Sequence, residues 1–270
     1  MNFGTTTLSI ETTDHVATLW LDRPDKLNAI SFDMWGDFIR AMEAIAANEE
    51  IRAVVVAGRG KSFCVGIDLA SLSAAPDLST TSGCLEQFKH TQLCQDGVSA
   101  IANCPVPVIA AIHSRCLGAG VDLATACDIR LASRDALFGV RETKIGIVAD
   151  VGTLQRLPGV VSAGHMAELA YTGKDISATR AEKIGLVNDV YEDAEAVYAA
   201  ALAMAGEIAA NAPLAVRGTK FVLRQSEGMT TEQSLLLNGL WTMVSSLKSN
   251  DLKEAMAAFM EKRPPSFTGS

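Results

Sequence analysis

Three acidic side chains stand in an otherwise mostly apolar stretch that contains a glycine turn. They are Asp122, Glu142 and Asp150, and the stretch runs from Pro105 to Gly152. A carboxyl group in apolar surroundings holds its proton more tightly, so its pKa moves toward neutrality, where it can exchange a proton with a substrate. The grouping therefore predicts a site for proton transfer.

Each acid also has a simpler use. Asp122 falls in the first turn of a predicted helix, where an acid interacts favourably with the helix dipole. Asp150 precedes an apolar run and is a common type of N-cap. Glu142 could form a salt bridge with a nearby Arg or Lys. Taken singly the acids are weak indicators, whereas three of them around one turn favour an active site.

The elements that would position these acids begin with the apolar run Val106 to Ile112, which predicts a strand buried on both faces. The chain then turns at Gly118-Ala119-Gly120, and apolar residues resume. A helix that starts near Gly118 points its free N–H groups out of the turn. Such groups bind an anion, or an oxygen that becomes anionic during a reaction.

A second glycine-rich loop, residues 58 to 69, follows another predicted strand at 52 to 57. It is not a phosphate-binding P-loop, because Val55 stands where that motif needs a glycine. The first turn likewise has Leu123 in place of the third glycine of a dinucleotide fingerprint. Two turns that each follow a strand can each contribute one backbone N–H to the same oxygen, as an oxyanion hole requires.

The rest of the chain reads as an α/β core followed by helices. Apolar alternation predicts strands at 7 to 11 and 15 to 21, and helical spacing predicts a helix from Ser31 to about Ala47. Residues 74 to 82 read as a polar surface loop of the kind that covers a site. A helix at 85 to 102 follows. Beyond the central stretch we expect helices at 154–157, 163–171 and 178–184, a strand at 186–190, and helices at 196–210, 214–225, 231–246 and 251–261.

Composition limits the classes of protein. The chain has 270 residues, 49% apolar and 20% charged, so it can bury a large core. No apolar run approaches the roughly 18 to 20 residues that span a bilayer, and the N-terminus has no signal pattern. We therefore expect a soluble cytoplasmic protein. A net charge of −8 argues against a nucleic-acid partner, and six cysteines without a CxxC pair, with four histidines, predict no metal site.

Four segments together resemble the crotonase, or enoyl-CoA hydratase/isomerase, superfamily. They are RPDKLNAIS at 23–31, GRGKSFCVGIDL at 58–69, PVIAAIHSRCLGAGVDLATACDIRLAS at 107–133 and EKRPPSF at 261–267. The resemblance implies a fold of ββα units wound in a spiral, with a core at 1–195 and a C-terminal helical trimerisation region at 196–270. It also implies homotrimers that often pair into hexamers, and a role in lipid metabolism such as fatty acid β-oxidation.

The substrate that the resemblance implies is an acyl-CoA thioester, so coenzyme A is part of the substrate and no separate cofactor is expected. The backbone N–H groups of Ile67 and Ala119 match the family's oxyanion hole. Enoyl-CoA hydratases carry glutamates at the positions of Asp122 and Glu142. Aspartate at the first position and the additional Asp150 resemble Δ(3,5),Δ(2,4)-dienoyl-CoA isomerases instead.

That subfamily shifts the double bonds of a 3,5-dienoyl-CoA to give a 2,4-dienoyl-CoA. The resemblance assigns Glu142 as the base that removes a proton from C2. Asp150 would deliver a proton to C6, and Asp122 would orient Glu142 or tune its proton affinity. The oxyanion hole would stabilise the intermediate dienolate.

Basic residues near these motifs are candidates for binding the phosphates of coenzyme A. They are Arg23, Lys26, Lys61 and, from a neighbouring subunit, Lys262, although each could equally be an ordinary solvated charge. Two other functions remain open. One is an enoyl-CoA hydratase that acts on a 2-enoyl-CoA. The other is a non-catalytic RNA-binding or assembly homologue, which the acidic net charge disfavours.

Overall fold

A mostly parallel sheet forms the centre of the computed structural model, which describes residues 5–72 and 76–270. Its strands lie in the order β1-β2-β3-β4-β6-β9, and only the β1–β2 pair is antiparallel. Their bounds are β1 (Leu8–Thr13), β2 (Val16–Leu21), β3 (Ala53–Gly58), β4 (Val108–Ile112), β6 (Ile129–Ser133) and β9 (Asp189–Tyr191). Strands β2, β3 and β4 are buried at every position, as continuous apolar runs in a covered sheet should be.

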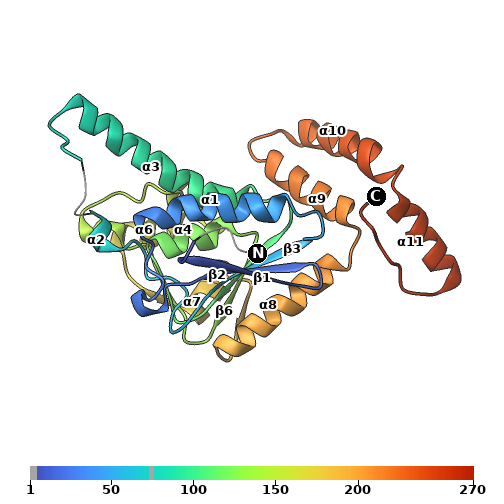
Figure 1. Cartoon of the computed structure of the whole chain (residues 1–270), viewed down its shortest axis with the longest axis horizontal. Coiled ribbons are helices and arrows are strands. Elements are labelled where there is room, and N and C mark those ends of the chain that lie inside the picture. The colour runs from blue at the N-terminus through green and yellow to red at the C-terminus, as the bar shows by residue number, and fades with distance from the viewer. Residues whose placement is uncertain (1–4, 73–75) are drawn as a thin grey trace.

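The two faces of this sheet bury different side chains. In β3, Val54 and Val56 belong to one hydrophobic cluster, whereas Val55 and Ala57 belong to the other, because successive side chains of a strand point to opposite faces. Helices α1 (Phe32–Ala46) and α3 (Thr81–Ala102) pack together over the first face, and α8 (Ala194–Ala209) covers the second (Figure 1).

A smaller sheet leads into the first glycine turn, since its strand β5 ends directly before Gly118. It contains β5 (Arg115–Leu117), β7 (Leu137–Gly139) and β8 (Ile176–Ser177), with β5 parallel to β7. The remaining elements of the core are short: η1 (Pro24–Lys26), α2 (Leu69–Leu72), α4 (Ala119–Ala126), η2 (Glu142–Ile145), α5 (Thr153–Arg156), η3 (Leu157–Gly159), α6 (Ala163–Thr172) and α7 (Ala178–Lys183).

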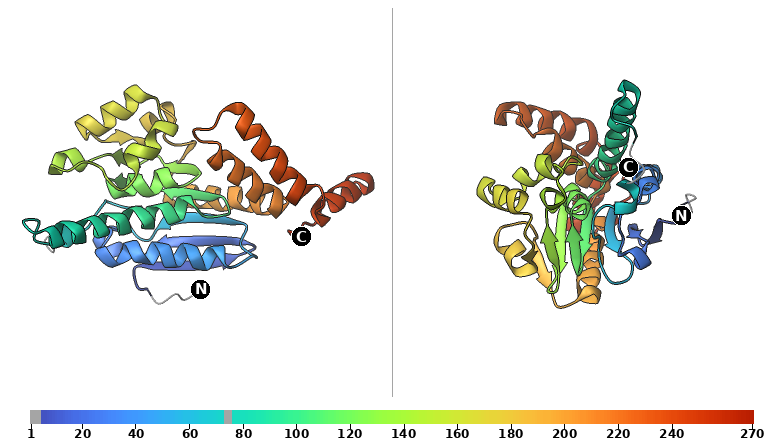
Figure 2. Two further views of the ribbon diagram at one scale, coloured as in Figure 1. Left: turned by 90° about the horizontal axis from the view of Figure 1, so that it is seen from above. Right: turned by 90° about the vertical axis from the view of Figure 1, so that its left-hand side faces the viewer.

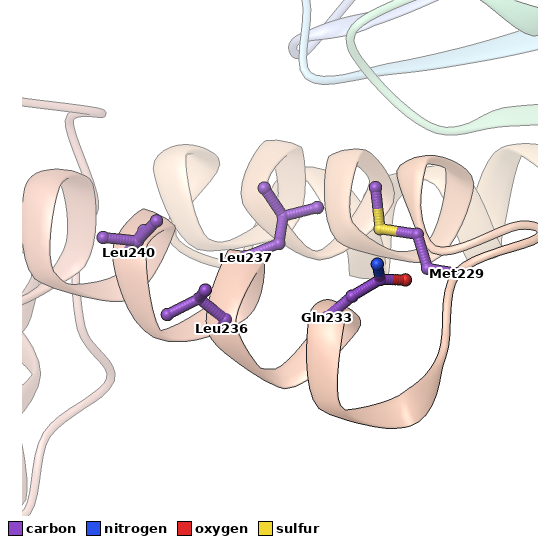
Figure 3. A pocket seen from close by; sticks show the side chains of 5 residues that line it. All are labelled: Met229, Gln233, Leu236, Leu237 and Leu240. Atoms are coloured by element: carbon purple, nitrogen blue, oxygen red, sulfur yellow. The ribbon is translucent and has the colours of Figure 1, made fainter.

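Three helices extend from one end of the core (Figure 2). They are α9 (Pro213–Gln225), α10 (Thr231–Trp241), which continues as a π-helical turn at Thr242–Ser246, and α11 (Asn250–Glu261). A buried lysine joins them to the core, since Lys220 Nζ lies 2.6 Å from Asp128 Oδ2 and donates to Val106 O at 2.9 Å. A groove of about 360 Å³ lies along α10 (Figure 3). It is lined by Met229, Gln233, Leu236, Leu237 and Leu240.

No single helix in the described ranges is long and apolar enough to cross a membrane. Helices α8 and α9 meet such a criterion only as a pair bent by 108°. Strands β3, β4 and β6 pack against α8, so this helix is part of the core of the protein.

The predicted order of elements is largely confirmed, but strands β5 to β8 were not predicted, and two predicted elements differ in position. Helix α3 begins at Thr81, inside the loop expected at 74 to 82, because the Thr80 side chain accepts a hydrogen bond from the N–H of Gly83 and caps the helix. Residues 74 and 75 of that loop lie outside the described residues. The strand expected at 186 to 190 forms only at Asp189–Tyr191, where it pairs with β6.

Candidate active site

The first glycine turn connects β5 to α4. Gly118 has φ 52° and ψ −122°, a conformation that favours glycine, and its N–H donates to Gly139 O at 2.8 Å. Ala119 is the first helical residue, so its N–H precedes the repeating bonds of the helix. We find no acceptor for this N–H among residues 5–72 and 76–270.

The second glycine-rich loop lies against this turn. Gly66 has φ 103°, and a Cβ added to it would be 3.0 Å from Leu117 O and 3.7 Å from Ala119 N. The bonds Ile30 N–H to Gly66 O (2.8 Å) and Asp68 N–H to Ile30 O (2.9 Å) flank Ile67. They leave the Ile67 N–H without an acceptor in the described part of the chain. Two unused backbone donors are thus brought close together.

Glu142 lies next to the first turn. Its Oε1 would be 3.4 Å from a Cβ added to Gly118, and its Oε2 is buried without a hydrogen-bond partner. Burial, together with the negative charges of Asp122 and Asp150, raises the pKa of Glu142 to about 7. The salt bridge considered for Glu142 is not formed within the described residues, and Arg141 pairs with Asp175 instead.

Asp122 points from the first turn of α4 toward the segment that carries the third acid. It is 1% exposed, and one of its carboxylate oxygens accepts a hydrogen bond from the N–H of Thr153. Burial raises the pKa of Asp122 to about 6, although the hydrogen bond from the N–H of Thr153 opposes that rise.

Asp150 is exposed and lies just before α5. It is not the N-cap of that helix, because Gly152 takes this position. No hydrogen bond to its carboxylate is found in the ranges that the structure covers, but its charge raises the pKa of both Asp122 and Glu142. The three acids predicted from the sequence are therefore close enough to interact.

Asp150 also lines a cavity of about 870 Å³. Residues of α3, the C-terminal end of α4, α5 and α9 form the other walls of this cavity. Open space thus borders the third acid, whereas one oxygen of Glu142 is enclosed by protein.

The four basic residues expected to bind the phosphates of coenzyme A do not lie together within one subunit. Arg23 forms an ion pair with Asp68 at 3.0 Å. Lys26 and Lys61 are exposed, and they belong to adjacent loops, since a Cβ added to Gly60 would be 2.7 Å from Pro24 Cβ. Lys262 caps α11, which lies at the opposite end of the long axis from α2, the helix that follows Asp68 (Figure 1).

Some contacts that shape the site were missed from the sequence. Thr153 and Gly66 act through their backbones, and neither residue type signals its partner.

No group of three His, Cys, Asp or Glu side chains in the part of the chain covered here is arranged to hold a metal ion.

The chain is similar to known proteins over nearly its whole length. Residues 11–270 match the family described as Enoyl-CoA hydratase/isomerase. The peroxisomal Delta(3,5)-Delta(2,4)-dienoyl-CoA isomerase of Arabidopsis thaliana is 41% identical over 261 residues, which are 95% of this chain and 94% of the relative. The mitochondrial Delta(3,5)-Delta(2,4)-dienoyl-CoA isomerase of Dictyostelium discoideum is 40% identical over 256 residues, which are 93% of this chain and 87% of the relative.

Solved structures of similar proteins share the fold. An enoyl-CoA hydratase from Bacillus anthracis superposes with a TM-score of 0.91 at 30% identity, covering 98% of this chain and 100% of that one. An enoyl-CoA hydratase from Mycobacterium smegmatis gives 0.87 at 31% identity, covering 97% and 98%. The resemblance noted in the sequence, and the crotonase-like fold with C-terminal helices that it implied, are confirmed.

Proposed function

Because the chain belongs to the enoyl-CoA hydratase/isomerase family of enzymes, we propose that it converts a 3,5-dienoyl-CoA to the 2,4-dienoyl-CoA. Two relatives at 40% and 41% identity are named for this reaction. The presence of Asp150 beside the two acids at the hydratase positions supports the same assignment. Such an isomerisation moves protons and adds no water.

The observation that carries the proposal is the position of Glu142. Its carboxyl lies beside Gly118, near the two unused N–H groups, and its pKa of about 7 leaves a substantial ionised fraction at neutral pH. A base of this kind removes a proton efficiently when its pKa is near the working pH. Glu142 is therefore assigned to C2, whose protons are acidified by the thioester carbonyl.

The N–H groups of Ile67 and Ala119 would bind the thioester oxygen. Removal of the C2 proton spreads negative charge from this oxygen along the diene to C6. Preorganised donors stabilise such charge more in the transition state than in the ground state. Both donors come from the backbone, so the isoleucine and alanine side chains do not remove them.

Asp150 would give a proton to C6 and so complete the shift. This step requires Glu142 to be ionised and Asp150 to be protonated in the substrate-bound enzyme. In one turnover Glu142 takes the proton from C2 and Asp150 gives one to C6; Glu142 then releases a proton to solvent and Asp150 takes one up. Asp122 bonds to the segment that carries Asp150 and raises the pKa of Glu142 through its charge. We therefore assign Asp122 to the orientation of this segment as well as to the tuning of Glu142.

Lys26 and Lys61 are proposed to meet the coenzyme A phosphates, since they are exposed on adjacent loops. Arg23 is held by Asp68 and would support that surface. Lys262 would reach it only from a neighbouring subunit. The exposed apolar side chains of α10 and α11, among them Leu236 and Phe259, support the expectation of a homotrimer or hexamer.

The location in the cell stays a prediction. The cytoplasm was expected from the sequence, whereas the relatives above are named peroxisomal and mitochondrial.

A direct assay with 3,5-octadienoyl-CoA tests the proposed reaction. The absorbance of the conjugated 2,4-dienoyl thioester should rise, and hydration of a 2-enoyl-CoA measured beside it should be much slower. Fast hydration without conversion of the diene would contradict the proposal and support the hydratase alternative.

A further inference from the structure

The segment that carries Asp150 is held through its backbone. Gln95 Nε2 on α3 donates a hydrogen bond to Asp150 O at 2.7 Å. Arg156 Nη1 donates to Val151 O at 3.4 Å, and the N–H of Thr153 donates to Asp122. The carboxylate of Asp150 takes no part in these bonds, so it is left available for a substrate.

Helix α3 supplies two of the supports from one face. Gln95 and Ser99 are four residues apart, which places them on the same side of a helix. Gln95 binds the Asp150 peptide directly, whereas Ser99 Oγ accepts from Arg156 Nη2 at 2.9 Å. The Arg156 guanidinium in turn lies against Gly152, where an added Cβ would be only 1.7 Å from Nη1.

These supports act together with packing, because Ala149 belongs to the main hydrophobic cluster and Val151 packs against it. Gln95, Ser99, Asp150, Gly152 and Arg156 all line the cavity of about 870 Å³. Asp150 itself is exposed between these packed neighbours, so the position of its peptide depends more on the hydrogen bond from Gln95. Loss of that bond would weaken the positioning of Asp150.

We propose that Gln95 is a positioning residue for the acid that protonates C6, and that the Ser99–Arg156 contact supports it. This inference rests on the proposed isomerase reaction. It has a consequence that a general loss of stability would not have, because Asp150 transfers a proton only in the C6 step. Gln95 makes no bond to Glu142 within the described residues, so removal of the C2 proton should depend on Gln95 much less than delivery to C6 does.

Two rates measured on the same enzyme separate the steps. One is the formation of the 2,4-dienoyl-CoA. The other is the exchange of C2 protons of the 3,5-dienoyl-CoA with D₂O, followed by mass spectrometry and NMR. The change Gln95→Met removes the donor at nearly constant length. Gln92→Met makes the same change on α3 at an exposed residue with no bond to the segment.

For Gln95→Met we expect isomerisation to fall by roughly two- to tenfold, the effect of one hydrogen bond, with C2 exchange unchanged. Ser99→Ala should lower the ratio of isomerisation to exchange in the same direction, and Gln92→Met should leave it unchanged. An unchanged ratio in both Gln95→Met and Ser99→Ala would overturn the inference. A wild-type enzyme that hydrates 2-enoyl-CoA but does not isomerise the diene would instead overturn the proposed function.

Discussion

A carboxylate oxygen of Asp122 accepts a hydrogen bond from the backbone N–H of Thr153. This bond connects the first turn of α4 to the segment that contains Asp150. Asp122 therefore contributes to the arrangement of the third acid, while its charge acts on Glu142. The three carboxyls form one coupled group whose members have different environments, as proton transfer at two carbon atoms requires.

The rate should depend on pH through Glu142. Only the ionised form removes a proton, and its pKa is raised to about 7. We therefore expect kcat/KM for the diene to fall about tenfold per pH unit below about pH 7. Asp122→Asn removes a negative charge near Glu142, so the pH below which kcat/KM falls should move to a lower value. If kcat/KM of the wild-type enzyme fell only below about pH 4.5, the ordinary pKa of a glutamate, this account of the base would be contradicted.

Ala119→Pro tests the oxyanion hole. Proline lacks the N–H but is tolerated at the first position of a helix, which Ala119 occupies in α4. The loss of one donor should lower kcat by roughly 100- to 1000-fold. Ala119→Ser retains the N–H and serves as the control. Similar kcat values for the proline and serine variants would show that this N–H does not contribute.

Asp122→Asn should make the protein more stable above pH 6. The pKa of the buried acid is about 6 in the folded protein and 3.8 in the reference state, so the folded state binds more protons between these values. Stability then falls as the pH rises through that window. Asparagine avoids this loss and still accepts from Thr153, so we expect a gain on the order of 1 to 3 kcal/mol at pH 8 that shrinks below pH 4. Urea unfolding of the wild type and the variant at pH 8 and below pH 4 measures this gain. An equal difference in the free energy of unfolding at the two pH values would refute the raised pKa of Asp122.

Lys220→Met should loosen the attachment of α9 to the core. The lysine is 7% exposed and bonds to both Asp128 and Val106 O. Its removal leaves a partly buried carboxylate without its cation, so the free energy of unfolding should fall by about 2–3 kcal/mol. The exposed Lys248 gives a matched control, Lys248→Met. Equal unfolding midpoints for the two variants would contradict a structural role for the buried pair.

The sequence predicted the parts of the fold that have strong periodicity. The apolar runs of β2, β3 and β4 and the stripe of α1 specify these elements locally. Strands β5 and β7 have three residues each, too few for a periodic pattern. They form because their partners are present, which is information held elsewhere in the chain.

The acids were found from the sequence, but their contacts were not. Asp150 looked like a possible N-cap because an apolar run follows it, and the actual cap position is set by Gly152 with φ 133°. The bond from Gln95 to Asp150 O joins residues 55 positions apart. Sequence spacing gives no signal for such a bond. The ion pair of Arg23 with Asp68 also joins residues far apart in the chain, so the sequence does not predict it either.

The variant Asp150→Asn tests the central claim most directly. If Asp150 protonates C6 and Glu142 removes the C2 proton, this enzyme should bind the 3,5-dienoyl-CoA and exchange its C2 protons with D₂O, yet form almost no 2,4-dienoyl-CoA. Isomerisation at the wild-type rate would contradict the account, because the third acid would then have no part in the reaction.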